Sequence, residues 1–470
     1  MTAESVAPYD ALEFAAPLPA TRRALLHRLA VGQTEGRAPS LVGSVVRDGR
    51  VVWTGARSCV DGHAPDGDTQ YRIGSLTKTF VAVLVLRLRN EGLLGLDDPL
   101  VDHLPEATEA GTATVAHLLS HTAGLAAEPR GPWWERTPGE LRPEPGDVFG
   151  ERPLVHPAGR RFHYSNSGFA LLGALVQRLR GAPWDEVLRR EVLEPLDLRR
   201  TTTRPCAPHA GGWAVHPWAD VLLPEPAAET GLMGPAGELW STTEDLGRWA
   251  AFLLDGDDRV LDAATLAEMR TPAAVQQPGD RDGGWGLGLQ LTHHQDRFLF
   301  GHGGSMPGFL AALWISPEDR LAAVVLANAT SGPQVGPVAA DLVRIVAEHE
   351  PRIPEPWRPL PAEEVDPALL ELTGPWFWGA TPFVLRLWAG RMLELSPVGA
   401  VGRASRFRPE PDGTWTGLDG YYLGETLRVV LDADGALSHL DVGTFVFTRE
   451  PYGSDDVVPG GVDPQGWRGL

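Results

Sequence analysis

The most informative segment of the chain is Arg72-Ile73-Gly74-Ser75-Leu76-Thr77-Lys78-Thr79-Phe80. Lys78 is the only lysine in the chain, so the 41 lysines and arginines comprise this residue and 40 arginines. A buried lysine can lose its proton and act as a base, whereas an arginine stays charged. Lys78 follows Ser75 by three residues, which places both on one face of a helix that starts at the serine. The pair therefore predicts a nucleophile and its activator.

An alternative is that the pair is exposed and has no chemical role, because Ser-x-x-Lys alone is a weak pattern. The residues that follow, Phe80 to Leu88, are apolar almost all round, which predicts a buried helix. Burying a lysine without a role is costly. We therefore expect Ser75 and Lys78 to lie together inside the protein.

Length and composition restrict the class of protein. A chain of 470 residues predicts two or three domains. A formal net charge of −20 argues against nucleic acid and anionic membranes as partners. Two cysteines exclude a disulfide framework, and neither a signal segment nor a membrane-spanning apolar run is visible. The sequence thus predicts a soluble, cytoplasmic protein.

Hydrophobic periodicity predicts a mixture of helices and strands up to about residue 350. Helices are predicted from 21 to 31, from Ser75 to near Asn90, from 169 to 179, 243 to 254, 263 to 269 and 335 to 348. Strands are predicted at 41–46, 51–54, 285–291, 298–301, 309–315 and 321–327. The first two strands flank Asp48-Gly49, a hairpin signal.

Two further motifs carry polar residues. Tyr164-x-Asn166 stands where a loop enters a helix, although helix capping explains such an asparagine equally well. His302-Gly303-Gly304 lies in a glycine-rich stretch after a predicted strand, where glycines allow a backbone to approach a ligand closely. Both motifs are candidate parts of one site.

Other segments are candidates for metal binding or for pocket walls. His117 and His121, four residues apart, face the same way on a helix, but no third ligand of matching spacing is visible, so we favour a packed, hydrogen-bonded helix end. Two long irregular stretches, 126–158 with Trp133-Trp134 inside it and 203–237, are candidate walls of a pocket. No metal and no cofactor is predicted.

The chain divides at a proline-rich segment, 351–367, which is a stiff linker. A loose lead-in, 1–18, precedes the main domain, 19–350. Short alternating strands with turns between them predict a small antiparallel, barrel-like β-domain at 368–452, and a tail follows at 453–470.

Ser75-x-x-Lys78, Tyr164-x-Asn166 and His302-Gly303-Gly304, in this order, resemble the motifs of the penicillin-recognising serine enzymes. That family includes class C β-lactamases, DD-peptidases, D-aminopeptidases and related esterases, and the resemblance spans roughly residues 20 to 350. It implies an α/β fold of the β-lactamase/transpeptidase type, with an antiparallel sheet flanked by helices and a helical subdomain. It also implies an acyl-enzyme on Ser75.

The resemblance implies a role for each motif residue. Lys78 if neutral, or Tyr164 if it is a phenolate, is the base that activates Ser75, and the sequence leaves both open. Tyr164 is also the expected proton donor to the leaving group. Asn166 is expected to orient Lys78 and a substrate carbonyl. The backbone N–H groups of Ser75 and Ser305 are the expected oxyanion hole.

One departure from the family narrows the activity. Many β-lactamases carry a lysine where this chain has His302, and a mostly neutral histidine suits a substrate carboxylate less well. The missing signal segment points the same way, because β-lactams and peptidoglycan lie outside the cytoplasm. A β-lactamase or DD-peptidase is therefore the less favoured prediction.

The C-terminal β-domain resembles the lipocalin-like module of the stand-alone penicillin-binding-protein-type thioesterases. These enzymes release a peptide from a carrier-protein thioester by head-to-tail cyclisation, so this reaction, on a small-molecule or carrier-tethered peptide substrate, is the most specific prediction. The alternatives are a cytoplasmic esterase or D-aminopeptidase and a non-catalytic peptide-binding protein. Substrate contacts are predicted at Trp133, Trp134, Gly303, Gly304 and Arg449, the last of which is otherwise a surface arginine.

Overall fold

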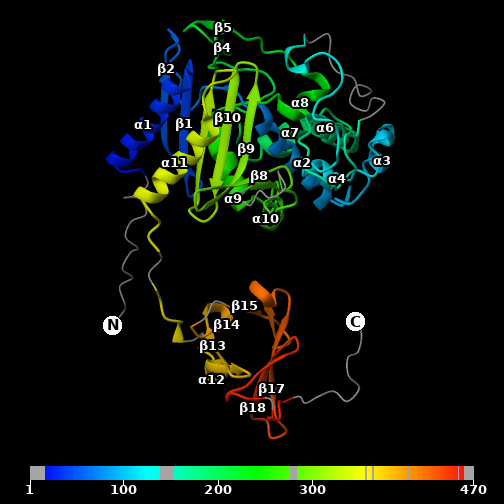
Figure 1. Ribbon diagram of the computed structural model, residues 1–470, viewed down its shortest axis with the longest axis vertical. Coiled ribbons are helices and arrows are strands. Elements are labelled where there is room, and N and C mark those ends of the chain that lie inside the picture. Colours follow the sequence, from blue (N-terminus) through cyan, green and yellow to red (C-terminus); the bar gives the residue numbers. More distant parts are fainter. Residues whose placement is uncertain are drawn as a thin grey trace. The chain divides into compact units, whose positions relative to one another are not determined.

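The chain forms two compact units, Met1–Ile353 and Pro354–Leu470, in the computed structural model (Figure 1). The structure describes residues 16–137, 153–275, 283–354, 357–362, 365–399, 402–453 and 455–459. The division between the units falls in the proline-rich segment. Each unit has a hydrophobic core of its own.

The first unit is built on a seven-stranded antiparallel sheet in the order β2-β1-β11-β10-β9-β8-β7. Its strands are β1 Ser40–Arg47, β2 Arg50–Ser58, β7 Gly283–Trp285, β8 Gln290–His294, β9 Arg297–Met306, β10 Phe309–Ser316 and β11 Leu321–Ala327. The strands β1 and β11, which are far apart in the sequence, are neighbours in the sheet, where Leu41 pairs with Ala327. This order confirms the predicted antiparallel sheet flanked by helices.

Helices cover both faces of the sheet, which is why strands β1 and β11 are buried along almost their whole length. Helices α1 (Pro19–Glu35) and α11 (Val335–His349) pack on one face. On the other face lie α2 (Thr77–Asn90), α6 (Asn166–Arg180) and α9 (Thr243–Asp255). The shorter helices are α3 Leu100–His103, α4 Val115–Leu119, α7 Trp184–Leu188, α8 Gly234–Gly237 and α10 Ala263–Met269.

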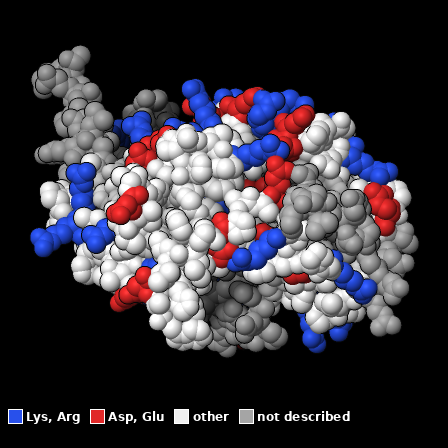
Figure 2. Space-filling model, turned by 90° about the horizontal axis from the view of Figure 1, so that it is seen from above, with Lys and Arg blue, Asp and Glu red and all other residues white. Residues whose placement is uncertain are grey.

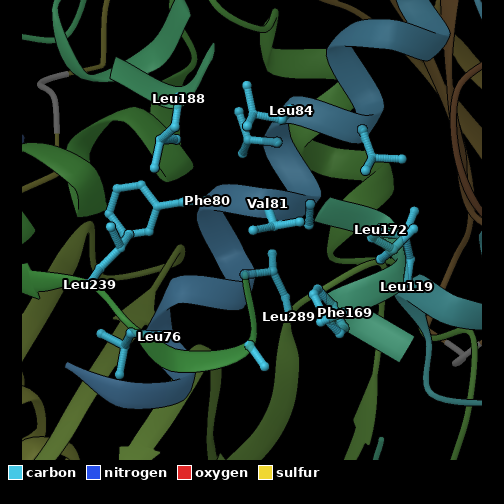
Figure 3. Packing of buried hydrophobic residues seen from close by; sticks show 14 of the residues in the cluster. Leu76, Phe80, Val81, Leu84, Leu119, Phe169, Leu172, Leu188, Leu239 and Leu289 are labelled. Atoms are coloured by element: carbon cyan, nitrogen blue, oxygen red, sulfur yellow. The ribbon is translucent and has the colours of Figure 1, made fainter. Parts of the chain in front are cut away.

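Helix α2 is buried nearly all round, as its sequence predicts. Phe80 stacks on Trp249 of α9 with ring centroids 3.9 Å apart, and the Trp249 indole N–H donates to Thr79 Oγ1. Figure 3 shows Phe80, Val81 and Leu84 among leucines and Phe169 of the neighbouring segments. Each such large side chain contributes about 1.5–3 kcal/mol when it is fully buried. The packing therefore fixes the helix that carries Lys78.

The glycine-rich part of the sheet differs from the prediction. The predicted strand 285–291 is two strands, β7 and β8, because the chain turns at Gly288, whose φ is +75°. In contrast, the strand predicted at 298–301 continues through the glycines as β9, up to Met306. Two short strand pairs lie outside the main sheet: β3 Tyr71–Arg72 with β6 Trp240–Ser241, and β4 Trp213–Val215 with β5 Leu222–Pro224.

The second unit is an eight-stranded antiparallel meander that is nearly closed into a barrel. It begins with α12 (Pro367–Leu372), and Phe377 of the first strand exchanges backbone hydrogen bonds with Thr448 after the last. The strands are β12 Gly374–Trp378, β13 Thr381–Leu387, β14 Leu393–Pro397, β15 Ser405–Pro409, β16 Trp415–Gly417, β17 Thr426–Leu431, β18 Leu437–Val442 and β19 Phe445–Phe447. The predicted barrel-like β-domain is confirmed.

Surface charge and hydropathy add little to the classification. On the face seen in Figure 2, acidic and basic side chains are interspersed, with uncharged residues between them. Among the described residues, no helix combines the length and apolar character that crossing a bilayer requires.

Candidate active site

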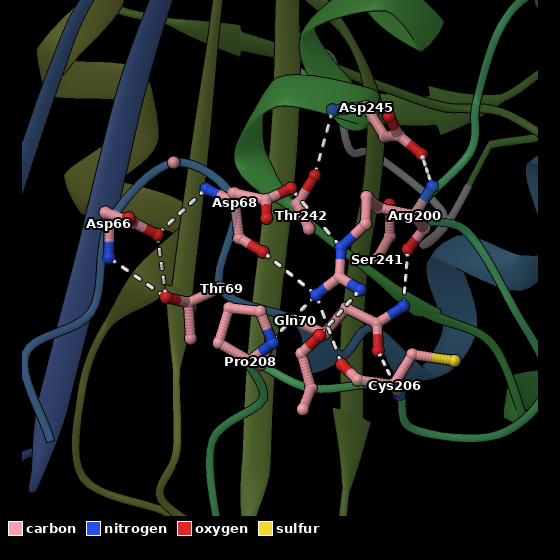
Figure 4. A network of polar contacts seen from close by, with 12 residues as sticks. Asp66, Asp68, Thr69, Gln70, Arg200, Cys206, Pro208, Ser241, Thr242 and Asp245 are labelled. Carbon is pink, nitrogen blue, oxygen red and sulfur yellow. Dashed lines mark hydrogen bonds and ion pairs between the residues drawn. The ribbon is translucent and has the colours of Figure 1, made fainter.

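The segment that carries Ser75 is anchored from behind by Arg200. The Arg200 guanidinium donates to the carbonyls of Asp68 and Pro208, and its own carbonyl accepts from the Gln70 side chain (Figure 4). Gln70 in turn accepts from the backbone N–H of Cys206. Strand β3 follows directly, so the chain enters the 3₁₀ turn Gly74–Leu76, and then α2, from a fixed position.

Ser75 and Lys78 lie together, as the spacing predicts. Lys78 Nζ is 2.9 Å from Ser75 Oγ and 2.5 Å from the carbonyl oxygen of Ala236 in α8. The lysine side chain is fully buried. Burial lowers the pKa of Lys78 to about 7, against the opposing effect of Glu128 and Glu135. Near neutral pH a large share of this amine is therefore uncharged.

Tyr164 lies over the amine, with its ring centroid 5.0 Å from Lys78 Nζ. Burial raises the pKa of Tyr164 well above its usual range, although a hydrogen bond with Ser75 opposes the rise. The ring stacks on His121 at 4.2 Å, and the backbone N–H of Ser165 donates to His121 Nδ1. Tyr164 is thus held in place as a neutral phenol.

Asn166 differs from the expected arrangement. Its amide Nδ2 donates to Glu128 Oε1 at 2.7 Å, whereas the hydrogen bonds of Lys78 go to Ser75 and Ala236. A carboxylate from the preceding loop therefore takes the amide N–H of Asn166, and the expected role of Asn166 toward Lys78 and a substrate carbonyl stays a prediction. Asn166 is also the first residue of α6, which Ser165 caps through Gly168 N–H.

Strand β9 brings the glycine-rich motif against the turn that carries Ser75. A Cβ on Gly304 would lie 2.0 Å from the carbonyl oxygen of Ile73, and one on Gly74 would lie 2.5 Å from the backbone nitrogen of Ser305. Gly74 also has a φ of +52°, which favours glycine. This close approach sets the backbone of Ser305 beside the turn of Ser75, where the two predicted oxyanion donors lie.

His302, within strand β9, is a neutral, buried imidazole. Only 3% of it is exposed, and burial, with Lys78 nearby, lowers its pKa to about 3. Its Nδ1 is hydrogen-bonded to the carbonyl of Gly303, so Nδ1 carries the proton and Nε2 is an acceptor. No partner for Nε2 is found among the described residues. The imidazole ring lies 6.2 Å from that of Tyr164.

The two tryptophans of the loop before the site have different surroundings. Trp134 is buried, and its indole N–H donates to Glu128 Oε2 at 2.8 Å. Trp133 is 57% exposed, and its indole N–H donates to Glu135 Oε2 at 2.9 Å. Of the predicted loop wall 126–158, residues 138–152 lie outside the described residues.

The remaining predicted residues have contacts within their own units. His117 closes a capping box with Thr114 at the start of α4, which confirms the prediction of a hydrogen-bonded helix end. No group of three metal-ligating side chains is found in the described part of the chain. Arg449 stacks on Trp376 and donates to the carbonyls of Glu371, Thr373 and Pro375, which ties the two ends of the barrel together.

Four residues at the site were not predicted: Glu128, Glu135, His121 as the support of Tyr164, and Trp285. Trp285 lies 5.1 Å from His302 and 5.6 Å from Tyr164, ring to ring. For Glu128 and Glu135, the sequence offers one signal, which is that these acidic residues precede and follow Trp133-Trp134. The sequence does not reveal the path of the loop that carries them.

Each of the two units matches a family of known proteins. Residues 22–348 match the family described as Beta-lactamase, and residues 365–449 match a family described as a domain of unknown function (DUF7586). Penicillin-binding protein 4 of Amycolatopsis lactamdurans is 29% identical over 63% of this chain and 82% of its own length. Beta-lactamase-like protein 2 of Dictyostelium discoideum is 27% identical over 53% of this chain, and the match spans only 48% of that protein.

Solved structures show the same architecture. The octameric penicillin-binding protein homologue from Pyrococcus abyssi aligns over 91% of this chain and 99% of its own, with a TM-score of 0.61 and 22% identity. A D-stereospecific amidohydrolase from a Streptomyces species aligns over 71% of this chain and 99% of its own, with a TM-score of 0.57 and 27% identity. SurE, in a structure with D-Leu, aligns over 92% of this chain and 100% of its own, with a TM-score of 0.56 and 26% identity.

Proposed function

Because the chain belongs to the Beta-lactamase family of serine hydrolases, we propose that it transfers an acyl group to Ser75 and from there to water or an amine. The observation that carries this proposal is the 2.9 Å separation of Ser75 Oγ from the amine of a fully buried Lys78. A serine hydroxyl is a weak nucleophile until a neighbouring base removes its proton. Lys78 is that base.

The steps follow from the positions of the groups. Neutral Lys78 takes the proton of Ser75 as Oγ bonds to the substrate's carbonyl carbon, and the backbone N–H groups of Ser75 and Ser305 stabilise the oxyanion, each by about 3 kcal/mol. The bond to the leaving group then breaks as Tyr164 gives it a proton, which Lys78 replaces. Water or an amine attacks the acyl-enzyme by the reverse steps.

The pKa values of the two candidate bases support Lys78 in this role. Burial brings the pKa of Lys78 to about 7, so the neutral base is plentiful at neutral pH. Burial raises the pKa of Tyr164, so a phenolate is scarce and the phenol is ready to act as a proton donor. Lys78 therefore serves as the general base, and Tyr164 serves as the general acid.

For the substrate we propose an amide or ester of a D-amino acid or of a peptide. Two structural relatives at 26–27% identity are a D-stereospecific amidohydrolase and a protein solved with D-Leu. The neutral His302 also suits these substrates better than it suits the carboxylate of a β-lactam. Head-to-tail cyclisation of a peptidyl thioester is the narrower proposal, supported by the barrel that follows the catalytic unit.

The test starts with a fluorophosphonate, followed by intact-mass measurement and peptide mapping; one adduct on Ser75 is expected, and no adduct would contradict acyl-enzyme chemistry. D- and L-aminoacyl p-nitroanilides then measure stereochemical preference. A peptidyl thioester mimic with a free amino terminus tests whether the protein cyclises a peptide or only hydrolyses it. Cyclic product supports cyclisation, and linear acid alone removes it.

A further inference from the structure

The barrel of the second unit has two unlike ends. Its strands pair in sequence order and antiparallel, so successive connections lie at alternate ends. Helix α12 leads directly into β12, so it lies at the end opposite to the β12–β13 turn. We call the end with that turn the mouth. Its connections are 379–380, 398–399 with 402–404, 418–425 and 443–444.

At the mouth, one arginine lies among three aromatic rings. The guanidinium carbon of Arg403 is 4.2 Å from the ring centroid of Tyr421, 4.9 Å from that of Phe445 and 5.1 Å from that of Trp378. The Phe445 ring in turn contacts Trp378 at 5.6 Å and Tyr421 at 5.8 Å. Each of these four residues lies in or beside a different connection, so the fold of the barrel assembles the group. Such rings attract a cation and hold it in place.

The charge of Arg403 is not balanced by a carboxylate. Within the described part of the chain, Arg403 forms no ion pair, and its buried Nη1 has no hydrogen-bond partner. Of the two acidic residues in the mouth connections, Asp419 pairs with Arg406. The other, Glu425, is exposed and forms no ion pair with Arg403. A partly buried guanidinium without a counter-charge is costly, and an anionic ligand relieves that cost.

The hydrogen bonding of Arg403 also leaves capacity for a ligand. Burial raises the pKa of Tyr422, while a hydrogen bond with Arg403 opposes the rise. The Tyr422 hydroxyl thus accepts one of the five N–H groups of the guanidinium, and the unpartnered Nη1 keeps its own. Because Arg403 is only partly buried, solvent and solutes reach it.

The surroundings of Arg403 are apolar. Exposed side chains of the mouth connections are those of Val398, Leu418, Tyr421 and Leu423. The interior of the barrel is filled by its own core, so a ligand has its place at the mouth and not inside. The rings already hold the cation of Arg403, which leaves them no room for a second one. The site therefore combines an unpaired positive charge with an exposed apolar rim.

From this arrangement we propose that the mouth of the barrel binds an organic carboxylate with an apolar body, through the guanidinium of Arg403. The planar guanidinium forms charge-assisted hydrogen bonds that match the geometry of a carboxylate. The rings hold the guanidinium in place, so little side-chain freedom is lost on binding. The apolar body covers the exposed leucines of the rim. The inference concerns the second unit alone and does not depend on the serine chemistry.

The experiment compares N-acetyl-leucine with N-acetyl-leucinamide, which has the same apolar body without the charge. Their Kd values are measured by ligand-observed NMR at pH 7 in the full-length wild type, Arg403→Gln and Arg386→Gln. Arg386 is the matched control, an exposed arginine on β13 that pairs with Glu394 near the opposite end of the barrel.

The wild type should bind the carboxylate at least tenfold more tightly than the amide. This preference should fall to within twofold in Arg403→Gln and stay unchanged in Arg386→Gln. Binding to the first unit does not respond to the loss of Arg403. An equal preference in Arg403→Gln and in the wild type, or no preference in the wild type, would therefore overturn the inference.

A second arm distinguishes two sources of such a carboxylate, the carboxyl terminus of a peptide and a fatty acid. Octanoate and octanamide form the second matched pair. Tighter binding of N-acetyl-leucine than of octanoate assigns the site to a peptide terminus, and the reverse order assigns it to a fatty acid. Absence of a carboxylate preference in both pairs would contradict the proposal.

Two further variants separate the site from the stability of the barrel. Arg403→Lys keeps the charge without the planar fork, so it should retain part of the carboxylate preference. Tyr421→Leu removes an exposed ring, and the Kd for the carboxylate should rise severalfold while the thermal midpoint stays within a few degrees. Butylguanidinium probes the rings themselves. If it binds to the wild type and neither carboxylate does, the rings are a cation site and the inference is overturned.

Discussion

Burial sets the chemistry of Lys78 and Tyr164. Lys78 Nζ has hydrogen bonds to Ser75 and Ala236, and within the described part of the chain it forms no ion pair with a carboxylate, so the loss of water around a positive charge is only partly compensated. Burial lowers the pKa of the amine and raises that of the phenol for the same physical reason, which is that it disfavours the charged form of each. Two predictions follow from these opposite shifts.

Replacing Lys78 with arginine should abolish acylation, because arginine keeps the charge but cannot give up its proton. The loss of a general base is expected to slow acylation by about 10²–10⁴-fold. The burst of p-nitrophenol from p-nitrophenyl acetate measures this rate, and circular dichroism checks the fold. Near-normal acylation in a folded variant would overturn the role of Lys78.

Removing the hydroxyl of Tyr164 should harm amides more than activated esters. An amine leaving group needs a proton, whereas p-nitrophenolate leaves without one, so in Tyr164→Phe the ratio of kcat/KM for the anilide to that for the ester should fall by about 10²-fold. An equal loss for both substrates would show that Tyr164 does not act as the leaving-group donor.

The sequence predicts the nucleophile and its base better than it predicts the residues that surround them. Ser75 and Lys78 are three residues apart on one turn, so local geometry alone brings them together. Glu128 reaches Asn166 across 38 residues of chain. That contact depends on the path of a loop, and loop paths have no periodic signal. The same reason explains why Glu128 was not predicted as the partner of the Asn166 amide.

Among the elements, β9 and the turn of Ser75 depend on each other most closely. Gly304→Ala places a Cβ 2.0 Å from the carbonyl oxygen of Ile73, so the strand must move away from the turn. The expected results are a thermal midpoint lower by several degrees and an acylation rate reduced by about 10²-fold, the effect of losing one oxyanion donor. The thermal midpoint of Gly303→Ala is the matched control, because its Cβ would meet only the carbonyl oxygen of Ala311, at 4.0 Å. Equal thermal midpoints in the two variants would contradict this.

The regular elements are predicted well and the glycine-rich ones less so. Strand β11 and helix α10 have the predicted bounds because their apolar patterns are unbroken. The glycines from Gly301 to Gly304 suggest a loop by composition, yet they continue a strand, since their lack of side chains is what allows the strand to lie against Ile73. Tertiary contact, which the sequence does not display, decides between the two.

At the scale of the whole molecule, the two units should unfold separately. The core of the barrel, which includes Trp376, Phe407 and Phe447, shares no residue with the cores of the catalytic unit. Calorimetry of the full chain should therefore show two transitions, and the isolated unit 354–470 should reproduce one of them within a few degrees. A single transition in the full chain, with an unfolded isolated barrel, would contradict this independence.

The single lysine allows the central claim to be measured directly. Protein grown with ¹³C,¹⁵N-labelled lysine has one side-chain signal, that of Lys78, and its chemical shift can be followed by NMR from pH 5 to pH 11. A neutral base beside Ser75 predicts a midpoint near 7. A midpoint near 10.5, the ordinary pKa of a lysine side chain, would mean that the amine is charged at neutral pH and cannot activate Ser75.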